Sequence, residues 1–435
     1  MKRKLFVIAA LALVSILIAF AYAFPRPPES GYTFPAIHIE TTLPIDRYIW
    51  DYATVTVMSD VDEFQLEGAS ARIRGRGHSS WRLDKRPFRI RFDEPQTMLD
   101  SGHAARDWSF IANHSDKSLM RNYSAYHLAS LLDGMSFAPF ARFVDIYING
   151  EYQGVYMLTI QVREGEGRAE LDGDSNPELS EFLIEMDSRL PTDGESIEGI
   201  DYVTVNNRHY DIHFPTSSAL TLDHVEYVRG FLANVDALIH AHDNAVFEYI
   251  HMPSFVDFYI VQELYKNVDI GYASVFMQIR GQGDERRLEM GPVWDFDISA
   301  GNAYFQGRGV NSMDEEYAYY YSPHGLWVAQ TNSWFRNLML MPEFFDAVTV
   351  RWNMIEDVEI RQTIDHINFM SERYQAAFER NFERWPILGE YVWPNPQRVV
   401  DIDTFRGQVD YLVEFLEIRK IGFGGFLNSN DTQAE

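Results

Sequence analysis

The sequence contains one strongly basic stretch, residues 72–91. Eight arginines and lysines stand there against a single acid, Asp84, so these twenty residues carry a net charge of +7. Alternation places Arg72, Arg74 and Arg76 on one face of a strand. The glycines at 75 and 77 allow a tight turn whose backbone amides can meet an anion. The stretch is interpreted either as a site for phosphate or another anion, or as a solvated strand face whose arginines pair with acids elsewhere.

A second candidate is the acidic pair in G-P-V-W-D-F-D-I-S-A-G-N, residues 291–302. If a strand continues through residues 293–298, Asp295 and Asp297 project to the same side, as paired carboxylates that share a hard cation do. Trp294 and Phe296 then face a core. The alternative is an edge strand whose two acids lie in water or pair with the basic stretch.

The third candidate is Asp269, which lies 26 residues before Asp295. It follows a predicted helix and precedes a predicted strand. A carboxylate at such a junction is either an ordinary helix cap or a general base held at the floor of a cleft. Both interpretations of Asp269 stay open on the residues alone.

The elements that must position these residues change in character along the chain. Short alternating strands dominate from Thr33 to about Asp211, and Asn149-Gly150 is typical of a two-residue hairpin turn. Helical spacing follows from about Leu222, with one more strand pair inside the helical part. The fold class predicted is α+β, with a strand-rich N-terminal lobe over residues 36–215 and a helix-rich C-terminal lobe over residues 216–427. The predicted strands are 53–58, 71–76, 86–92, 141–150, 151–158, 181–186, 202–205, 273–280 and 288–298, and the predicted helices are 223–240, 254–267 and segments after 333.

Composition excludes several classes of protein. The chain has 37 Lys and Arg against 64 Asp and Glu, a net charge of −27, which argues against a general nucleic-acid or anionic-membrane binder. It has no cysteine, so it has no disulfide scaffold, thiolate zinc site or cysteine nucleophile. With 46% hydrophobic residues it has the composition of a folded globular protein.

The N-terminus predicts export from the cytoplasm. Three basic residues, a long apolar run and an A-x-A spacing make residues 1–23 a signal peptide or an uncleaved signal anchor. Residues 24–35 then form a Pro-rich linker, and residues 428–435 a frayed tail. We expect a secreted or extracytoplasmic protein that meets a membrane only through an uncleaved N-terminal segment.

Taken together and in this order, these stretches resemble the spore coat protein H (CotH) kinase family. The resemblance covers nearly the whole exported part, and W-D-F-D downstream of R-G-R-G-x-S-x-W is its most specific element. The matching stretches are I-R-G-R-G-H-S-S-W (73–81), K-R-P-F-R-I-R-F (85–92), W-S-F-I-A-N-H-S-D-K-S-L-M-R-N (108–122), V-D-I-Y-I-N-G-E-Y-Q-G-V-Y-M-L (144–158), F-L-I-E-M-D-S-R (182–189), N-V-D-I-G-Y-A-S-V-F-M-Q-I (267–279), G-P-V-W-D-F-D-I-S-A-G-N (291–302), R-N-F-E-R-W-P (380–386) and F-L-E-I-R-K (415–420).

The resemblance implies an atypical protein-kinase-like, two-lobed fold that binds ATP with Mg²⁺ or Mn²⁺ and phosphorylates Ser or Thr of a surface or coat protein. Such chemistry needs cations on the phosphates, a carboxylate-held metal and a group that positions the acceptor hydroxyl. The resemblance implies that Lys85, Arg74 and Arg76 bind phosphate and that Asp295, Asp297 and Ser274 bind the metal. It implies catalysis by Asp269 with Lys85, and an ion pair between Glu185 and Lys85. Asp116, as a helix N-cap, and Arg121 and Asn122 are expected to have structural roles.

Three positions depart from the family's pattern. His78 stands where Asn is expected after R-G-R-G, Ser274 where Asn follows the catalytic-type Asp, and Gln161 where Y-x-L-x-E has its Glu. Gln161 does not carry the charge of Glu, so the departures favour, as an alternative, a weak or inactive module that binds protein or carbohydrate in a surface or coat assembly. A third hypothesis is hydrolysis of a phosphate ester by the carboxylate pair.

Overall fold

The computed structural model describes residues 34–190, 196–304 and 323–430. The predicted signal segment 1–23, all but the last two residues of the linker 24–35, and the end of the tail 428–435 lie outside the described residues. None of the helices in the described ranges combines the length and the apolar character needed to cross a membrane.

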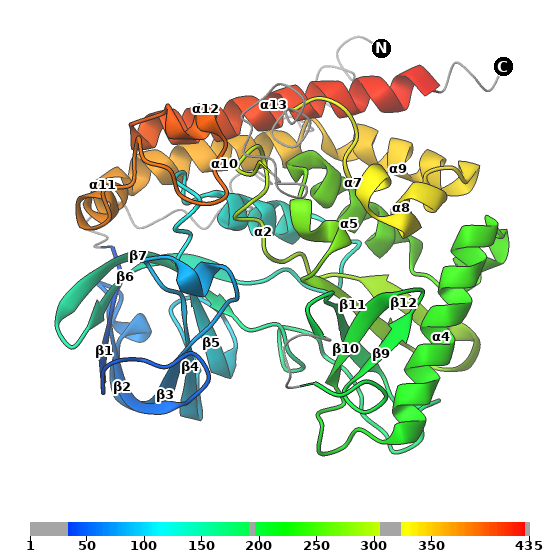
Figure 1. The fold of residues 1–435 in the computed structure, drawn as a ribbon, viewed down its shortest axis with the longest axis horizontal. Helices are drawn as coiled ribbons and strands as arrows, with labels where there is room; N and C mark the ends of the chain where they lie inside the picture. Colours follow the sequence, from blue (N-terminus) through cyan, green and yellow to red (C-terminus); the bar gives the residue numbers. More distant parts are fainter. Residues whose placement is uncertain (1–33, 191–195, 305–322, 431–435) are drawn as a thin grey trace, which may run out of the picture.

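Seven strands close into a barrel in the order β1-β2-β3-β4-β5-β7-β6 (Figure 1). Neighbouring strands are antiparallel except β1 and β6, which pair in parallel. Alternation turns one face of each strand inward, so that Ile73, Ile90 and Trp108 are fully buried in the barrel core. The strands are β1 Ala36–Thr41, β2 Asp51–Met58, β3 Leu66–Gly75, β4 Phe88–Thr97, β5 Ala104–Ile111, β6 Ala141–Ile148 and β7 Glu151–Ile160.

A second, five-stranded antiparallel sheet has the order β12-β11-β8-β10-β9. Figure 1 shows it beside the barrel, with α4 along its outer edge. Its strands are β8 Phe182–Met186, β9 Tyr202–Val205, β10 Arg208–Phe214, β11 Val275–Arg280 and β12 Arg287–Met290. Because β8 pairs with β11, this sheet joins residues from both sides of the predicted boundary at 215.

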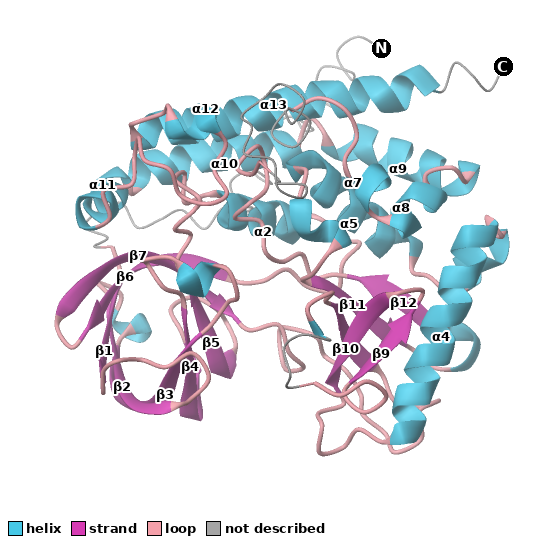
Figure 2. Ribbon diagram, in the orientation of Figure 1, coloured by secondary structure: helices cyan, strands magenta, loops and turns pink. Residues whose placement is uncertain are grey.

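Most of the helices form a layer that covers the barrel and the second sheet from one side (Figure 2). Helix α2 packs against α5 and α10, and α11 packs on β7 of the barrel. The helices are α2 Arg121–Leu131, α4 Leu222–Ala241, α5 Met252–Tyr265, α7 Val328–Thr331, α8 Ser333–Leu338, α9 Pro342–Ile355, α10 Glu359–Arg373, α11 Gln375–Arg384, α12 Gln397–Val400 and α13 Phe405–Asn430.

The strand-rich N-terminal part and helical C-terminal part are confirmed, as is the Asn149-Gly150 hairpin, whose two residues have φ of 49° and 79°. The strand predicted over 288–298 is wrong beyond its start, because β12 ends at Met290 and Asp295 has φ of 64°, outside the β region. Strands β1, β5 and β10 were not among those predicted. The N-terminal strands close into a barrel, and the kinase-like two-lobed arrangement stays a prediction.

Candidate active site

A cleft with a volume of about 360 Å³ opens where the barrel, the second sheet and the helical layer meet. Most of its lining comes from four segments far apart in the sequence. These are the end of β3 and the turn after it (74–80), the end of β8 (185–189), the junction between α5 and β11 (269–274) and the loop after β12 (294–298). The basic stretch, the acidic pair and Asp269 thus meet at one place.

Three carboxylates lie in this cleft, those of Asp269, Asp295 and Asp297. Burial and the neighbouring charge of Asp295 raise the pKa of Asp269 to about 8, against the opposing pull of Arg189. Burial, with the charges of Asp295 and Asp269, also raises the pKa of Asp297 well above its ordinary value. The three groups therefore repel one another, and a cation in the cleft would relieve that repulsion.

Asp269 is not the cap of its own short 3-10 helix, Val268–Gly271. That role belongs to Asn267, whose Oδ1 accepts a hydrogen bond from the Asp269 amide at 3.1 Å. The Asp269 carboxylate is left to face the cleft. The cap interpretation of Asp269 is therefore wrong.

Asp295 and Ser274 both have left-handed backbones, with φ of 64° and 60°. A non-glycine residue in this region costs about 1–2 kcal/mol, and such strain concentrates at functional sites. The Ser274 hydroxyl donates to Asp295 Oδ2 at 3.3 Å, and Asn267 Nδ2 donates to the Asp295 carbonyl at 3.3 Å. The left-handed turn aims the Asp295 carboxylate into the cleft while Trp294 and Phe296 are buried in the core.

Two arginines face the carboxylates. In the described part of the chain no hydrogen bond or ion pair engages the Arg76 guanidinium, which lies 5.8 Å from the Trp294 ring centre. Burial lowers the pKa of Arg76, while Asp295 and Asp297 act to raise it. Arg189 donates from Nε to Asp187 Oδ1 at 2.7 Å. Burial opposes ionisation there, but the bonds to Asp187 raise the pKa of Arg189.

Lys85 does not lie among the cleft residues. Its side chain is 1% exposed, and its ammonium lies 4.7 Å from the Tyr156 ring centre. Nζ donates to the Val155 carbonyl and, at 2.8 Å, to Asn381 Oδ1 on α11. Burial lowers the pKa of Lys85. The Lys85 ammonium is therefore held inside the protein and does not reach the cleft, where we predicted that it binds phosphate. The cations that line the cleft include Arg76 and Arg189.

Glu185 lines the cleft, but its partner is a histidine and not Lys85. His213 Nε2 lies 2.8 Å from Glu185 Oε2, and His213 Nδ1 lies 3.8 Å from Asp211. Glu185 and Asp211 are directly opposite on β8 and β10, where two carboxylates repel. Burial disfavours the imidazolium, yet the two carboxylates raise the pKa of His213. The predicted Lys85–Glu185 ion pair is therefore replaced by an acid–histidine–acid chain.

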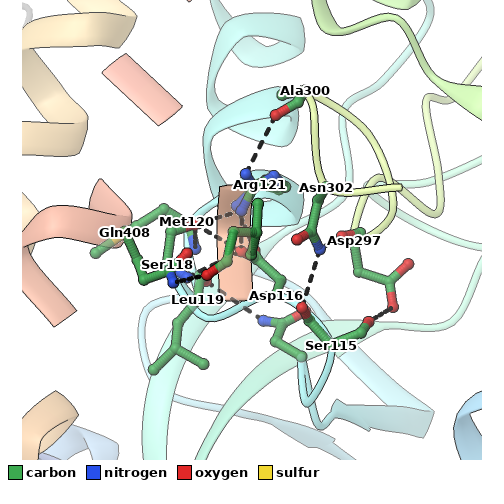
Figure 3. A network of polar contacts seen from close by, with 12 residues as sticks. Ser115, Asp116, Ser118, Leu119, Met120, Arg121, Asp297, Ala300, Asn302 and Gln408 are labelled. Carbon is green, nitrogen blue, oxygen red and sulfur yellow. Dashed lines mark hydrogen bonds and ion pairs between the residues drawn. The ribbon is translucent and has the colours of Figure 1, made fainter. Parts of the chain in front are cut away.

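A buried network holds the acidic loop against α2 (Figure 3). Asp116 and Arg121 form an ion pair at 2.5 Å, with both side chains 0% exposed. Arg121 donates to the Ser299 and Ala300 carbonyls at 3.0 and 3.1 Å. Its neighbour Asn122 accepts from the Phe296 amide, between the two loop acids, at 2.6 Å. This network fixes the backbone that presents both carboxylates.

The N-cap of α2 is Met120, not Asp116 as predicted. Asp116 Oδ2 nevertheless accepts the amide hydrogen bond of Arg121, the first residue of the helix, at 2.9 Å. The prediction located the right interaction but placed the cap four residues too early. Asp116 acts from the loop before the helix.

The three positions that depart from the family's pattern, His78, Gln161 and Ser274, all line the cleft. Gln161 Oε1 accepts from the Ser109 hydroxyl at 2.9 Å. Burial and Arg47 lower the pKa of His78, so a neutral imidazole is favoured there. Each departure thus changes the charge or the donors of the cleft itself.

Sequence reasoning missed Asp187 and Arg189, which lie in the cleft just after β8. Their signal was the ending of F-L-I-E-M-D-S-R, where an acid and a base follow a buried strand. It also missed Trp393, which comes from the loop before α12 and for which the sequence offered no signal.

The residues fit a divalent metal held together with phosphate. In the described ranges, no three His, Asp or Glu side chains form a metal site by themselves. Mg²⁺ in phosphoryl-transfer sites is held by one or two carboxylates and completes its shell with phosphate oxygens and water. Asp295 and Asp297, with the Ser274 hydroxyl beside them, supply that kind of incomplete oxygen set.

A family model described as CotH kinase protein matches residues 72–421, most of the chain. The match begins at the first arginine of the basic stretch and ends within α13. It spans all four cleft-forming segments. A search of curated proteins found no match to this chain.

Proposed function

The chain belongs to the CotH kinase family, and from this premise we propose that it is an exported, metal-dependent phosphotransferase. It moves a phosphoryl group from ATP to a Ser or Thr hydroxyl of a surface or coat protein. The observation that carries the proposal is a single cleft lined by three carboxylates and two guanidiniums, those of Asp269, Asp295, Asp297, Arg76 and Arg189.

In the proposed mechanism, each group has one task. Asp295 and Asp297, with Ser274, would hold Mg²⁺ or Mn²⁺, and the bound metal would neutralise charge on the phosphates. Arg76 binds phosphate oxygens, taking the role first given to Lys85. Arg74, which also lines the cleft, adds a second cation on the barrel side.

Asp269 orients the acceptor hydroxyl and accepts its proton. The acceptor oxygen bonds to the γ-phosphorus as the bond to the bridging oxygen breaks, and ADP leaves with that electron pair. Without a cation in the cleft, burial and the charge of Asp295 raise the pKa of Asp269 to about 8. A cation held at Asp295 would lower that pKa toward the operating pH, where a general base works best. Glu185, held by His213, balances the charge of Arg76 and Arg189.

The test is transfer of labelled phosphate from ATP with Mn²⁺ by the purified protein. We expect Asp269→Asn and Asp295→Asn each to lower the rate at least about 100-fold. Asn suits position 295 because it tolerates a left-handed backbone better than Ala. Asp365→Asn, an exposed change on α10, is the matched control and should keep full activity.

Transfer that survives both cleft substitutions would refute these assignments. Thermal unfolding with ATP and Mn²⁺ separates the kinase from the alternative, a binding module. A nucleotide site raises the melting temperature by mass action. An unchanged melting temperature would favour the alternative that neutral Gln161 suggests, in which a protein or carbohydrate is bound and no nucleotide is used. Stabilisation without transfer would show a nucleotide site that does not transfer phosphate.

A further inference from the structure

Strand β10 has an irregularity at His213. Its pairing with β8 shifts between Ile212 and Phe214, as it does where a β-bulge inserts an extra residue. Bulges re-aim a side chain and are common beside active sites. At this one the His213 ring packs against Phe276, with 5.9 Å between the ring centres, and Phe276 lines the cleft. The irregularity therefore lies where a histidine meets the wall of the cleft.

The His213 ring stands between two carboxylates. Glu185 on β8 and Asp211 on β10 are directly opposite each other in the sheet, where like charges repel. His213 Nε2 lies 2.8 Å from Glu185 Oε2, and His213 Nδ1 lies 3.8 Å from Asp211 Oδ2. At most 23% of any of these side chains is exposed, so water screens their charges only in part. Without a charged imidazole between them, Asp211 would repel Glu185.

Glu185 also lies near the arginines of the cleft. Burial lowers the pKa of Arg76, and the charge of Glu185 is one of those that act to raise it. Both residues line the cleft. Within the described ranges, however, Glu185 forms its ion pair with His213, and no hydrogen bond or ion pair joins Glu185 to Arg76. The carboxylate is therefore directed toward the histidine and not toward the guanidinium.

The direction of Glu185 decides what Arg76 can bind. A guanidinium holds a carboxylate or a phosphate by the same N–H donors, often two in parallel. If Glu185 turned to Arg76, it would occupy donors that a phosphate needs and cancel their charge. Repulsion by Asp211 favours such a turn, and the bond to His213 opposes it.

We propose that His213 is a positioning residue, which holds Glu185 away from Arg76 and so keeps that guanidinium open to a phosphate group. His213 does not line the cleft and acts through Glu185 alone. The inference rests on the proposed function only in taking the phosphate group to be that of ATP.

The hold on Glu185 depends on the proton of the imidazole. The charged groups that face His213 are Glu185 on β8, Asp211 on β10 and, acting against the charge, Arg163. Phe276, which packs on the ring from β11, is uncharged. Burial disfavours the imidazolium, but the two acids raise the pKa of His213 above its ordinary value. Below that raised pKa the hold is complete, and it weakens as the pH rises through it.

The test measures binding of inorganic tripolyphosphate with Mg²⁺ by calorimetry, which needs neither a nucleoside nor phosphate transfer. His213→Gln keeps a neutral donor and removes the charge. We expect this variant to bind tripolyphosphate about tenfold more weakly than the natural protein at about pH 6. The two affinities should converge toward about pH 9, as the natural histidine loses its proton. Their ratio is compared because other groups titrate in both proteins, and a ratio that does not change with pH would overturn the proposal.

The double variant His213→Gln/Glu185→Gln separates positioning from support of the sheet. A neutral amide at position 185 does not pair with Arg76, so the double variant should bind tripolyphosphate more tightly than His213→Gln alone. Binding as weak as in His213→Gln would mean that His213 only supports the fold, and would contradict the inference. The matched control is His209→Gln on the same strand, because the His209 ring lies 3.0 Å from Thr204 Oγ1 and outside the cleft. Its affinity should equal that of the natural protein.

Kinetics with ATP distinguish this inference from the proposed function. In a chain that transfers phosphate, His213→Gln should raise the KM for ATP about tenfold at about pH 6 and change kcat little, because the weakened contact is with bound phosphate. A lowered kcat with an unchanged KM would contradict the inference. The expected tripolyphosphate results in a protein that transfers no phosphate would confirm the role of His213 and refute the kinase proposal.

Discussion

Asp269 shows how much one residue's surroundings decide. A carboxylate at a helix-to-strand junction is often an ordinary helix cap. Here Asn267 caps the turn, and Asp269 lies buried near the charge of Asp295. Burial and that second charge raise the pKa of Asp269 to about 8. Without a cation, the folded protein therefore holds a proton on Asp269 near neutral pH, and ionising the group has a cost to the stability of the folded protein.

That cost predicts a pH dependence with a definite sign. Between pH 4 and pH 8 the folded protein holds a proton on Asp269 that the unfolded chain has already released. Stability from this group is thus lost as the pH rises through that window. Asp269→Asn should remove the loss, making the variant more stable than the natural protein at pH 8 by the order of 2 kcal/mol, although inactive.

The measurement is urea unfolding of both proteins at pH 5 and pH 8 without divalent metal. The quantity compared is the difference between the two proteins, because other groups titrate in both. A difference that does not grow with pH would show that Asp269 is solvated and ionised in the folded state.

At the scale of elements, the loop after β12 depends on α2. The carboxylates of Asp295 and Asp297 flank Phe296, whose amide donates to Asn122 at 2.6 Å. The buried Asp116–Arg121 pair holds the end of the same loop at Ser299 and Ala300. A left-handed backbone is unfavourable for a non-glycine residue such as Asp295. These contacts therefore stabilise the turn.

Asn122→Ala should therefore affect function more than folding. It leaves the buried Phe296 amide without its acceptor, which costs about 1–3 kcal/mol of stability. Misplacing the two carboxylates should lower phosphate transfer by about 100-fold. Both quantities are measured, with Asn368→Ala on α10 as the control, since Asn368 lies in a helix that makes no part of the cleft. Transfer reduced only in proportion to the folded fraction would refute a positioning role.

At the scale of the whole molecule, Lys85 belongs to the joint between the barrel and the helical layer. Asn381 on α11 accepts from Lys85 Nζ at 2.8 Å and from the Val155 amide at 3.1 Å. Arg380, one residue earlier, reaches Asp145 on β6 at 2.7 Å. Since β3, β4 and the loop after β12 must keep their relative positions, this joint preserves the cleft from a distance.

Lys85→Met should accordingly lower the stability of the fold and leave nucleotide binding unchanged. Loss of two buried hydrogen bonds is expected to lower the free energy of unfolding by about 1–3 kcal/mol. The KM for ATP should stay unchanged, because Arg76 and not Lys85 lies in the cleft. Urea unfolding and steady-state kinetics measure the two effects, and Arg86→Met, an exposed neighbour, is the control for stability. A raised KM for ATP with an unchanged free energy of unfolding would show instead that Lys85 binds phosphate.

The sequence by itself determined the strand-to-helix order, the face on which Arg72 and Arg74 lie and the Asn149-Gly150 turn, and it named Asp269, Asp295 and Asp297 as candidates. These depend on local rules, namely the period of two along a strand, the turn chemistry of Asn-Gly, and residue type. The family resemblance rested on the same local stretches.

Only the tertiary structure decided which charges meet. Lys85 and Arg76 look equivalent in the basic stretch, but one is buried against α11 and the other faces Asp295. The His213–Glu185 pair came from strands β10 and β8 of the second sheet, and Arg189 from the turn after β8. Long-range packing decides which side chain is desolvated and which distant residue becomes its partner. The local spacing of residues does not predict either.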